Sequence, residues 1–156
     1  MKQLVQHLGS GSLEVLDVPC PQVAPGHLLM RSRASVISAG TERMLVEFAR
    51  ANLLQKARRQ PKRVQQALDK IKTDGLWTTL DAIRGRLDQP LAMGYSNLGE
   101  VIGVGEGVDG FQIGDRVASN GPHAEVVHVP RNLCVRIPET VEDEQAAFTV
   151  LASIPL

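Results

Sequence analysis

The sequence predicts a mainly β domain that is interrupted by a helical insertion. Residues 1–42 and 91–156 read as short strands separated by turn residues, whereas the apolar residues of 43–90 recur at helical spacing. The 156 residues are 43% hydrophobic and 22% charged, which is typical of one globular domain with a real core. We therefore expect a β domain with about three inserted helices.

The first part of the chain is expected to hold three strands in an antiparallel arrangement. Strand-like runs rich in Leu, Val and Ile lie at 4–5, 13–18 and 28–37. Gly9-Ser10-Gly11 and the Pro-rich segment 19–26 supply the turns between them.

Three helices are expected in the insertion. The first covers 43–58, the second begins near Pro61 and stops at Gly75, and the third covers about 76–87. The segment 43–90 holds 11 of the 17 Lys and Arg residues but only 5 of the 17 Asp and Glu residues. This basic excess could bind an anionic ligand such as a nucleotide-sugar, form a solvated face, or contact another subunit.

The strand pattern returns after Leu91. Four further strands are expected, at 99–104, 116–119, 124–129 and 134–137. Thr140 and Asp143 have the spacing of a capping box, which predicts a last helix from Val141 to about Ser153. Because this helix runs apolar into Leu156, we expect the chain to be part of a longer protein.

The glycines of 105–110 spell G-x-G-x-x-G, the spacing of a dinucleotide-binding loop. That motif requires a helix directly after the glycines, since pyrophosphate binds the free N–H groups of the helix N-terminus. Turn residues at Gly114-Asp115 leave no room for such a helix. We therefore expect tight turns here, with glycines at positive φ angles.

Composition excludes several other classes. The formal net charge is zero and the isoelectric point is near 6.9, so no overall field favours nucleic acid or an anionic membrane. The sequence shows neither a signal peptide nor an apolar run of transmembrane length, so we expect a cytoplasmic protein. Cys20 and Cys134 are expected to be separate reduced thiols, with Cys134 buried rather than reactive. A surface or packing role is expected for His123 and His128.

Several motifs resemble those of one family. Residues 94–108 and 111–117 are similar to the G-H-E-x-x-G-x-V-x-x-V-G and G-D-R-V signatures of medium-chain alcohol dehydrogenases, and 121–127 resembles the family's GGHAEYV strand. The resemblance covers 1–42 and 91–156. The segment 43–90 resembles an insertion in bacterial two-part oxidoreductases, in which a dehydrogenase-like half precedes a sugar-oxidoreductase-like half.

The resemblance implies a fold, a reaction and partners. The fold would be a GroES-like, partly open β-barrel that carries the substrate side of the enzyme, with the chain ending before the cofactor domain. NAD or NADP would bind a C-terminal Rossmann domain beyond Leu156, so the isolated chain would be inactive. A small-molecule substrate, sugar-related in character, would be reduced or oxidised by hydride transfer, and a homo-oligomer is expected.

The zinc ligands of that family are not matched. Ala39, in Ser38-Ala39-Gly40-Thr41-Glu42, stands where the resemblance would place a cysteine. Gly94-Tyr95-Ser96 has Tyr and Ser in place of His and Glu, and neither is a good zinc ligand. We therefore expect no zinc.

The resemblance also nominates the catalytic groups. Thr41 keeps the hydroxyl that relays a proton in the zinc enzymes, and Tyr95 could donate to a carbonyl oxygen, with Ser38 or Glu42 orienting it. Ser96 and Asn97 are expected to contact substrate. Two alternatives stay open: Tyr95 fills the space left by the metal while Ser96 and Asn97 form a turn, or the whole chain is a non-catalytic binding module.

Overall fold

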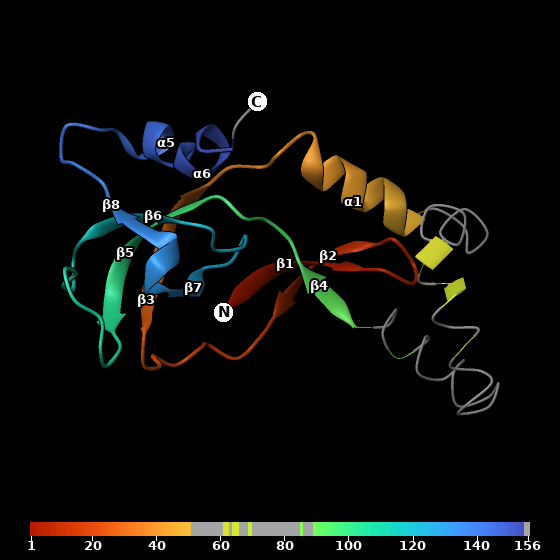
Figure 1. Cartoon of the computed structure of the whole chain (residues 1–156), viewed down its shortest axis with the longest axis horizontal. Helices are drawn as coiled ribbons and strands as arrows, with labels where there is room; N and C mark the ends of the chain where they lie inside the picture. Colours follow the sequence, from red (N-terminus) through yellow and green to blue (C-terminus); the bar gives the residue numbers. More distant parts are fainter. Residues whose placement is uncertain (51–60, 63, 66–68, 70–84, 86–88, 155–156) are drawn as a thin grey trace. The chain divides into compact units, whose positions relative to one another are not determined.

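A computed structural model describes residues 1–50, 61–62, 64–65, 69, 85 and 89–154. Figure 1 shows the elements in chain order. The chain divides into two compact units. The first comprises Met1–Leu4, Val15–Glu42 and Ala92–Leu156, and the second comprises Val5–Glu14 and Arg43–Leu91. The candidate site lies within the first unit.

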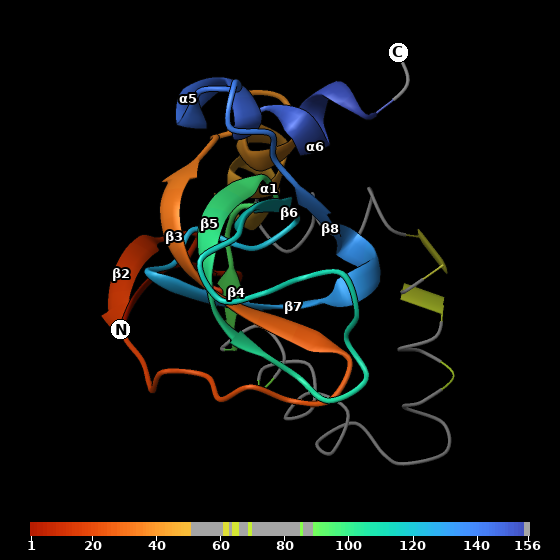
Figure 2. The ribbon, with the colours of Figure 1, turned by 90° about the vertical axis from the view of Figure 1, so that its left-hand side faces the viewer.

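An antiparallel sheet of five strands forms the centre of the first unit, as Figure 2 shows. In the order of their pairing, its strands are β7 (Val126–Pro130), β3 (His27–Ser35), β5 (Asn97–Val104), β6 (Arg116–Ser119) and β8 (Cys134–Arg136). The short 3-10 helix η1 (Arg131–Leu133) joins β7 to β8. Register shifts after Leu29 and Ser32 bend β3 where it pairs with β5.

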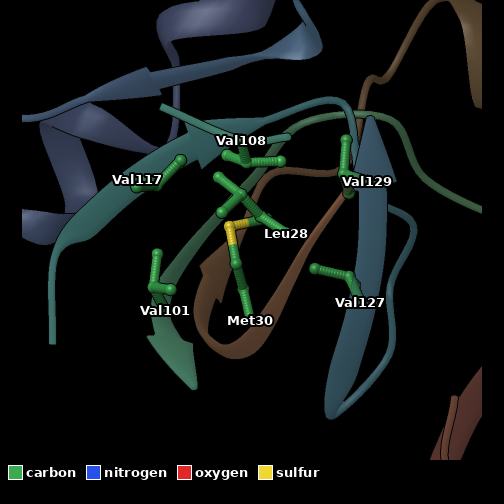
Figure 3. Packing of buried hydrophobic residues seen from close by; sticks show 7 residues of the cluster. All are labelled: Leu28, Met30, Val101, Val108, Val117, Val127 and Val129. Carbon is green, nitrogen blue, oxygen red and sulfur yellow. The ribbon is translucent and has the colours of Figure 1, made fainter. Parts of the chain in front are cut away.

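The hydrophobic core lies where the inward residues of these strands meet. Leu28, Met30, Val101 and Val117 are 0% exposed and belong to one cluster. Val108, Val127 and Val129 complete this cluster, and Figure 3 shows its side chains pointing toward one another. This arrangement confirms the predicted mainly β class, and its strands form two sheets that do not close into one barrel.

A second sheet has three strands, in the order β2 (Leu13–Asp17), β1 (Lys2–His7) and β4 (Pro90–Ala92). The prediction that the first three strands form one antiparallel arrangement is wrong, because β3 lies in the other sheet. The physical reason is that Leu28 and Met30 are fully buried between β5 and β7, which β3 pairs on its two sides. Strand β4 was not expected, since it is three residues long, exposed, and begins with a proline.

Helix α1 (Thr41–Arg50) agrees with the first predicted helix in its position, and it begins two residues earlier than expected. The rest of that helix and nearly all of the second and third predicted helices lie outside the described residues. No helix among the described residues is both long enough and apolar enough to span a membrane. Both cysteines are free thiols, as expected, and Cys134 is partly buried.

The last predicted helix is wrong in its length, because two short helices replace it: α5 (Asp143–Ala146) and α6 (Thr149–Ala152). Side chains occupy the carbonyl groups that a continuous helix would use. The Thr149 hydroxyl donates to the carbonyl of Ala146 at 2.7 Å, and Ser96 Oγ donates to that of Ala147 at 2.6 Å. The predicted single helix is therefore interrupted between α5 and α6.

The predicted capping box is also absent, because Glu142 is the N-cap residue of α5 and makes no side-chain capping bond. Asp143 instead accepts hydrogen bonds from Arg116 at 3.0 and 2.6 Å and forms an ion pair with Arg33 at 3.1 Å. These contacts fix α5 against the sheet.

Candidate active site

Three segments of the first unit are joined by backbone hydrogen bonds and form the candidate site. They are the turn between β3 and α1 (36–42), the approach to β5 (93–96), and the loop before β7 (121–124). The N–H of Val36 donates to the carbonyl of Ser96 at 2.9 Å, and the N–H of His123 donates to that of Met93 at 2.7 Å. Residues far apart in the sequence are thereby held together.

The structure brings the two predicted catalytic hydroxyls together. The phenol of Tyr95 donates to Thr41 Oγ1 at 3.3 Å, although 54 positions separate the two residues. Tyr95 is partly buried and Thr41 is exposed. The pair is therefore fixed on one side and accessible to a ligand on the other.

Ser38 and Glu42 hold the turn that carries Thr41. The N–H of Thr41 donates to Ser38 Oγ at 3.3 Å, and the N–H of Ser38 donates to Glu42 Oε1 at 2.9 Å. This reciprocal pattern is that of a capping box in which the acid stands one position later than usual. The two residues thus act on Thr41 through the backbone, rather than by a hydrogen bond to Tyr95.

Ser96 and Asn97 face the interior. Both are 1% exposed. Ser96 bonds the Ala147 carbonyl as described, and the amide nitrogen of Asn97 donates to Ser32 Oγ at 2.9 Å. The predicted contact of these two side chains with a substrate stays a prediction, and their burial does not support it. In the structure their hydrogen bonds connect the start of β5 to α5 and to β3.

His123 is the residue that sequence reasoning assigned only a surface or packing role. Its side chain is 9% exposed, and its ring bonds on both sides: Nδ1 lies 2.9 Å from Ser35 Oγ, and Nε2 lies 3.1 Å from Glu42 Oε2. No signal in the sequence pointed to this role, because the burial of Glu42, which makes a second polar partner necessary, is visible only in the structure. The sequence alone does not identify that partner.

The residues at the positions where the family resemblance would place zinc ligands offer poor ligand atoms or are bonded elsewhere. Ala39 offers no ligand atom, Ser96 Oγ is committed to a carbonyl, and Tyr95 bonds Thr41. Zinc in proteins is held by Cys, His, Asp and Glu. In the part of the chain that the structure describes, no three such residues lie close enough to hold a metal ion.

The G-x-G-x-x-G segment lacks the strand-to-helix geometry of a dinucleotide-binding loop. It follows β5, Gly107 and Gly110 have φ angles of 75° and 81°, and the chain continues through turns into β6 rather than into a helix. A cavity of about 340 Å³ in the same unit is lined by residues including Met1, Pro19 and His128, and by none of the predicted site residues.

Comparison with known proteins agrees with this fold. Residues 70–139 match the family model described as "Alcohol dehydrogenase GroES-like domain", a match that begins inside the segment 43–90. A partially reducing polyketide synthase of Menisporopsis theobromae is 43% identical over 63 residues, which are 39% of this chain and 2% of that protein.

Two solved structures show the same architecture over nearly the whole chain. A mycobacterial quinone oxidoreductase gives a TM-score of 0.62 at 22% identity, covering 97% of this chain and 38% of the other. A mycobacterial protein complexed with NADPH gives 0.60 at 22% identity, covering 100% and 42%. The chain thus spans well under half the length of these proteins. Residues 70–139 of this chain are thus similar to the alcohol dehydrogenase GroES-like domain, and its fold is similar to that of part of these two proteins.

Proposed function

We propose that this chain is the substrate-side domain of a zinc-independent, NAD(P)-dependent oxidoreductase that interconverts a carbonyl compound and an alcohol. The observation that carries the proposal is the Tyr95–Thr41 hydroxyl pair, an accessible proton donor and its partner at 3.3 Å. The family match and the similarity to an NADPH-complexed protein support the reaction class.

The two hydroxyls can perform the proton transfer that the reaction needs. A reduced nicotinamide bound in the longer protein would supply a hydride to the carbonyl carbon, and negative charge would then develop on the carbonyl oxygen. Tyr95 then donates its proton to that oxygen, giving the alcohol. Thr41, which accepts the phenol hydrogen in the free protein, can return a proton to Tyr95 and recover its own from solvent, because it is exposed.

Zinc is not needed for this assignment. In a zinc enzyme the metal holds the developing alkoxide and lowers its pKa. Here the hydrogen bond from Tyr95 takes that role, as an oriented donor at the position where negative charge develops.

The rest of the protein is assigned by the same reasoning. We propose that 1–42 and 91–156 form the catalytic-side domain, that 43–90 is inserted into it, and that NAD or NADP binds a Rossmann domain supplied by a longer chain. The short coverage of the solved structures supports the last point. A cytoplasmic location, a sugar-related substrate and a homo-oligomer remain parts of this proposal.

The test is titration of NADH and NADPH into the full-length protein, with metal analysis of the same sample. We expect saturable binding of one nucleotide without stoichiometric zinc. In a carbonyl reduction assay, Tyr95→Phe should lower kcat by about 10²- to 10⁴-fold, the usual contribution of a positioned acid. Thr41→Val should lower kcat as well, whereas Thr140→Val, the same change at an exposed threonine, should not.

The non-catalytic binding module remains the second candidate. Two observations favour it: Ala39 stands where the family resemblance would place a zinc-ligating cysteine, and Ser96 is bonded to the Ala147 carbonyl inside the domain. Failure of both nucleotides to bind the full-length protein would support this second candidate and refute the oxidoreductase.

A further inference from the structure

The hydrogen-bonded pair of His123 and Glu42 has no part in the proton transfer described above. The side chains are 9% and 6% exposed, and Nε2 lies 3.1 Å from Oε2. The other carboxylate oxygen, Oε1, accepts the N–H of Ser38. Glu42 therefore connects the imidazole ring directly to the turn that presents Thr41.

Further contacts hold His123, both through its ring and through its backbone. Its Nδ1 bonds Ser35 Oγ, and its backbone N–H bonds the Met93 carbonyl. Gly94 lies against it so closely that an added Cβ would be 2.6 Å from the ring carbon Cδ2. Because Tyr95 follows Gly94 directly, the ring contacts both segments that carry the hydroxyl pair.

The direction of these two bonds depends on which ring nitrogen carries hydrogen. An ionised carboxylate only accepts hydrogen bonds, so with Glu42 ionised the nitrogen that faces it, Nε2, is the donor. In the neutral ring, Nδ1 then accepts from the Ser35 hydroxyl. Because the side chains of His123 and Glu42 are buried, little water competes for the hydrogen bond between them, and this bond holds both side chains in place.

We propose that His123 is a positioning residue that sets the placement of the Thr41 hydroxyl against the Tyr95 phenol. This inference rests on the proposed function for its biological meaning, but the geometry it describes can be measured without activity. Loss of the ring would leave the Glu42 carboxylate buried with one partner fewer. The turn at 38–42 would then shift, and Thr41 would move with it.

The experiment uses 3-fluorotyrosine placed at position 95 alone in the full-length protein, read by ¹⁹F NMR. Thr41→Val serves as the reference, because it removes the acceptor of the phenol and should move the resonance. We expect His123→Ala to move or broaden the resonance by more than its width. His123→Gln, whose amide can replace one bond, should lie nearer the wild type.

Two further variants keep the test decisive if His123→Ala folds poorly. Ser35→Ala removes only the outer bond of the ring, and it should shift the resonance in the same direction by less. His27→Gln changes a histidine that bonds the Pro25 carbonyl and stacks on His128, so it should leave the resonance in place.

A resonance that stays at the wild-type position in His123→Ala and Ser35→Ala would overturn the proposal. So would a lower Tm with an unchanged resonance, because the ring would then have only a structural role. In the active enzyme, His123→Ala should lower kcat at least tenfold while the KM for the nucleotide stays within twofold. Failure of nucleotide binding would refute the proposed function but leave the ¹⁹F result, so the two failures are distinguishable.

Discussion

Replacing Gly94 with alanine should destabilise the protein strongly, because two independent costs meet at this position. Its φ is +92°, where a Cβ costs about 1–2 kcal/mol. The new methyl group would also lie 2.6 Å from His123 Cδ2 and 2.7 Å from the His123 backbone nitrogen, and such overpacking costs about 1–3 kcal/mol. We therefore expect a loss of about 2–5 kcal/mol in the free energy of unfolding.

Urea denaturation measures this loss directly. With a slope of about 2 kcal/mol per molar urea, the midpoint should fall by about 1–2.5 M. Gly107→Ala is the matched control, because Gly107 has a φ of +75° but no atom within 4 Å of its added Cβ. It should lose only about 1–2 kcal/mol. Equal losses in the two variants would refute the close approach of His123 to Gly94.

Three further predictions concern groups outside the hydroxyl pair. Burial raises the pKa of Cys134 to about 11, so at pH 8 iodoacetamide should modify the exposed Cys20 first, and equal rates would contradict this. Burial, followed by the charge of a neighbouring histidine, lowers the pKa of His128, which favours the neutral ring in the folded state. The contribution of the neutral His128 ring to the free energy of unfolding is therefore present above the unfolded-state pKa of about 6.5, and it is lost as the pH falls toward the lower folded-state pKa. His128→Phe should therefore lose less unfolding free energy than the wild type between pH 7 and pH 5, and equal slopes would refute this. Asp143→Asn weakens the partner of two arginines and should lower the free energy of unfolding by about 1–3 kcal/mol. Asp17→Asn changes a 79% exposed side chain that pairs with Lys2, and it should cost about 0–1 kcal/mol. Equal losses in urea denaturation would show that the contacts of Asp143 add nothing.

The strands were predictable because each has a local signal. Apolar residues with turn residues on both sides mark β2, β3, β5 and β6, and the structure places these strands within two residues of the predicted ends. The rejection of the glycine motif as a dinucleotide site was also a local argument, since Gly114-Asp115 stops any helix. The structure confirms that turns and then β6, rather than a helix, follow these glycines.

What the sequence could not provide depends on contacts between distant residues. The partners of β3 are chosen by the burial of Met30 against β5 and β7. The break between α5 and α6 depends on Ser96, which is 51 positions from the carbonyl it bonds. The bond between His123 and Glu42 spans 81 positions, and no local pattern predicts such a pair.

The two residues of the Tyr95–Thr41 contact were predicted from the family resemblance rather than from a local pattern. The resemblance to a dehydrogenase family nominated both residues, and the backbone bonds among the three segments bring them within 3.3 Å. Spacing in the sequence would not have paired them. The same resemblance nominated Ser96 and Asn97, whose burial shows that a matching position need not keep a matching role.

The most direct test of the central claim is the transfer of deuterium from a nicotinamide cofactor labelled at C4 to aldehyde and ketone substrates, with the full-length protein and mass spectrometry of the alcohol. The account predicts one deuterium at the carbinol carbon, undiminished by a zinc chelator and greatly slowed by Tyr95→Phe. An unlabelled product, a rate abolished by the chelator, or full activity in Tyr95→Phe would contradict it.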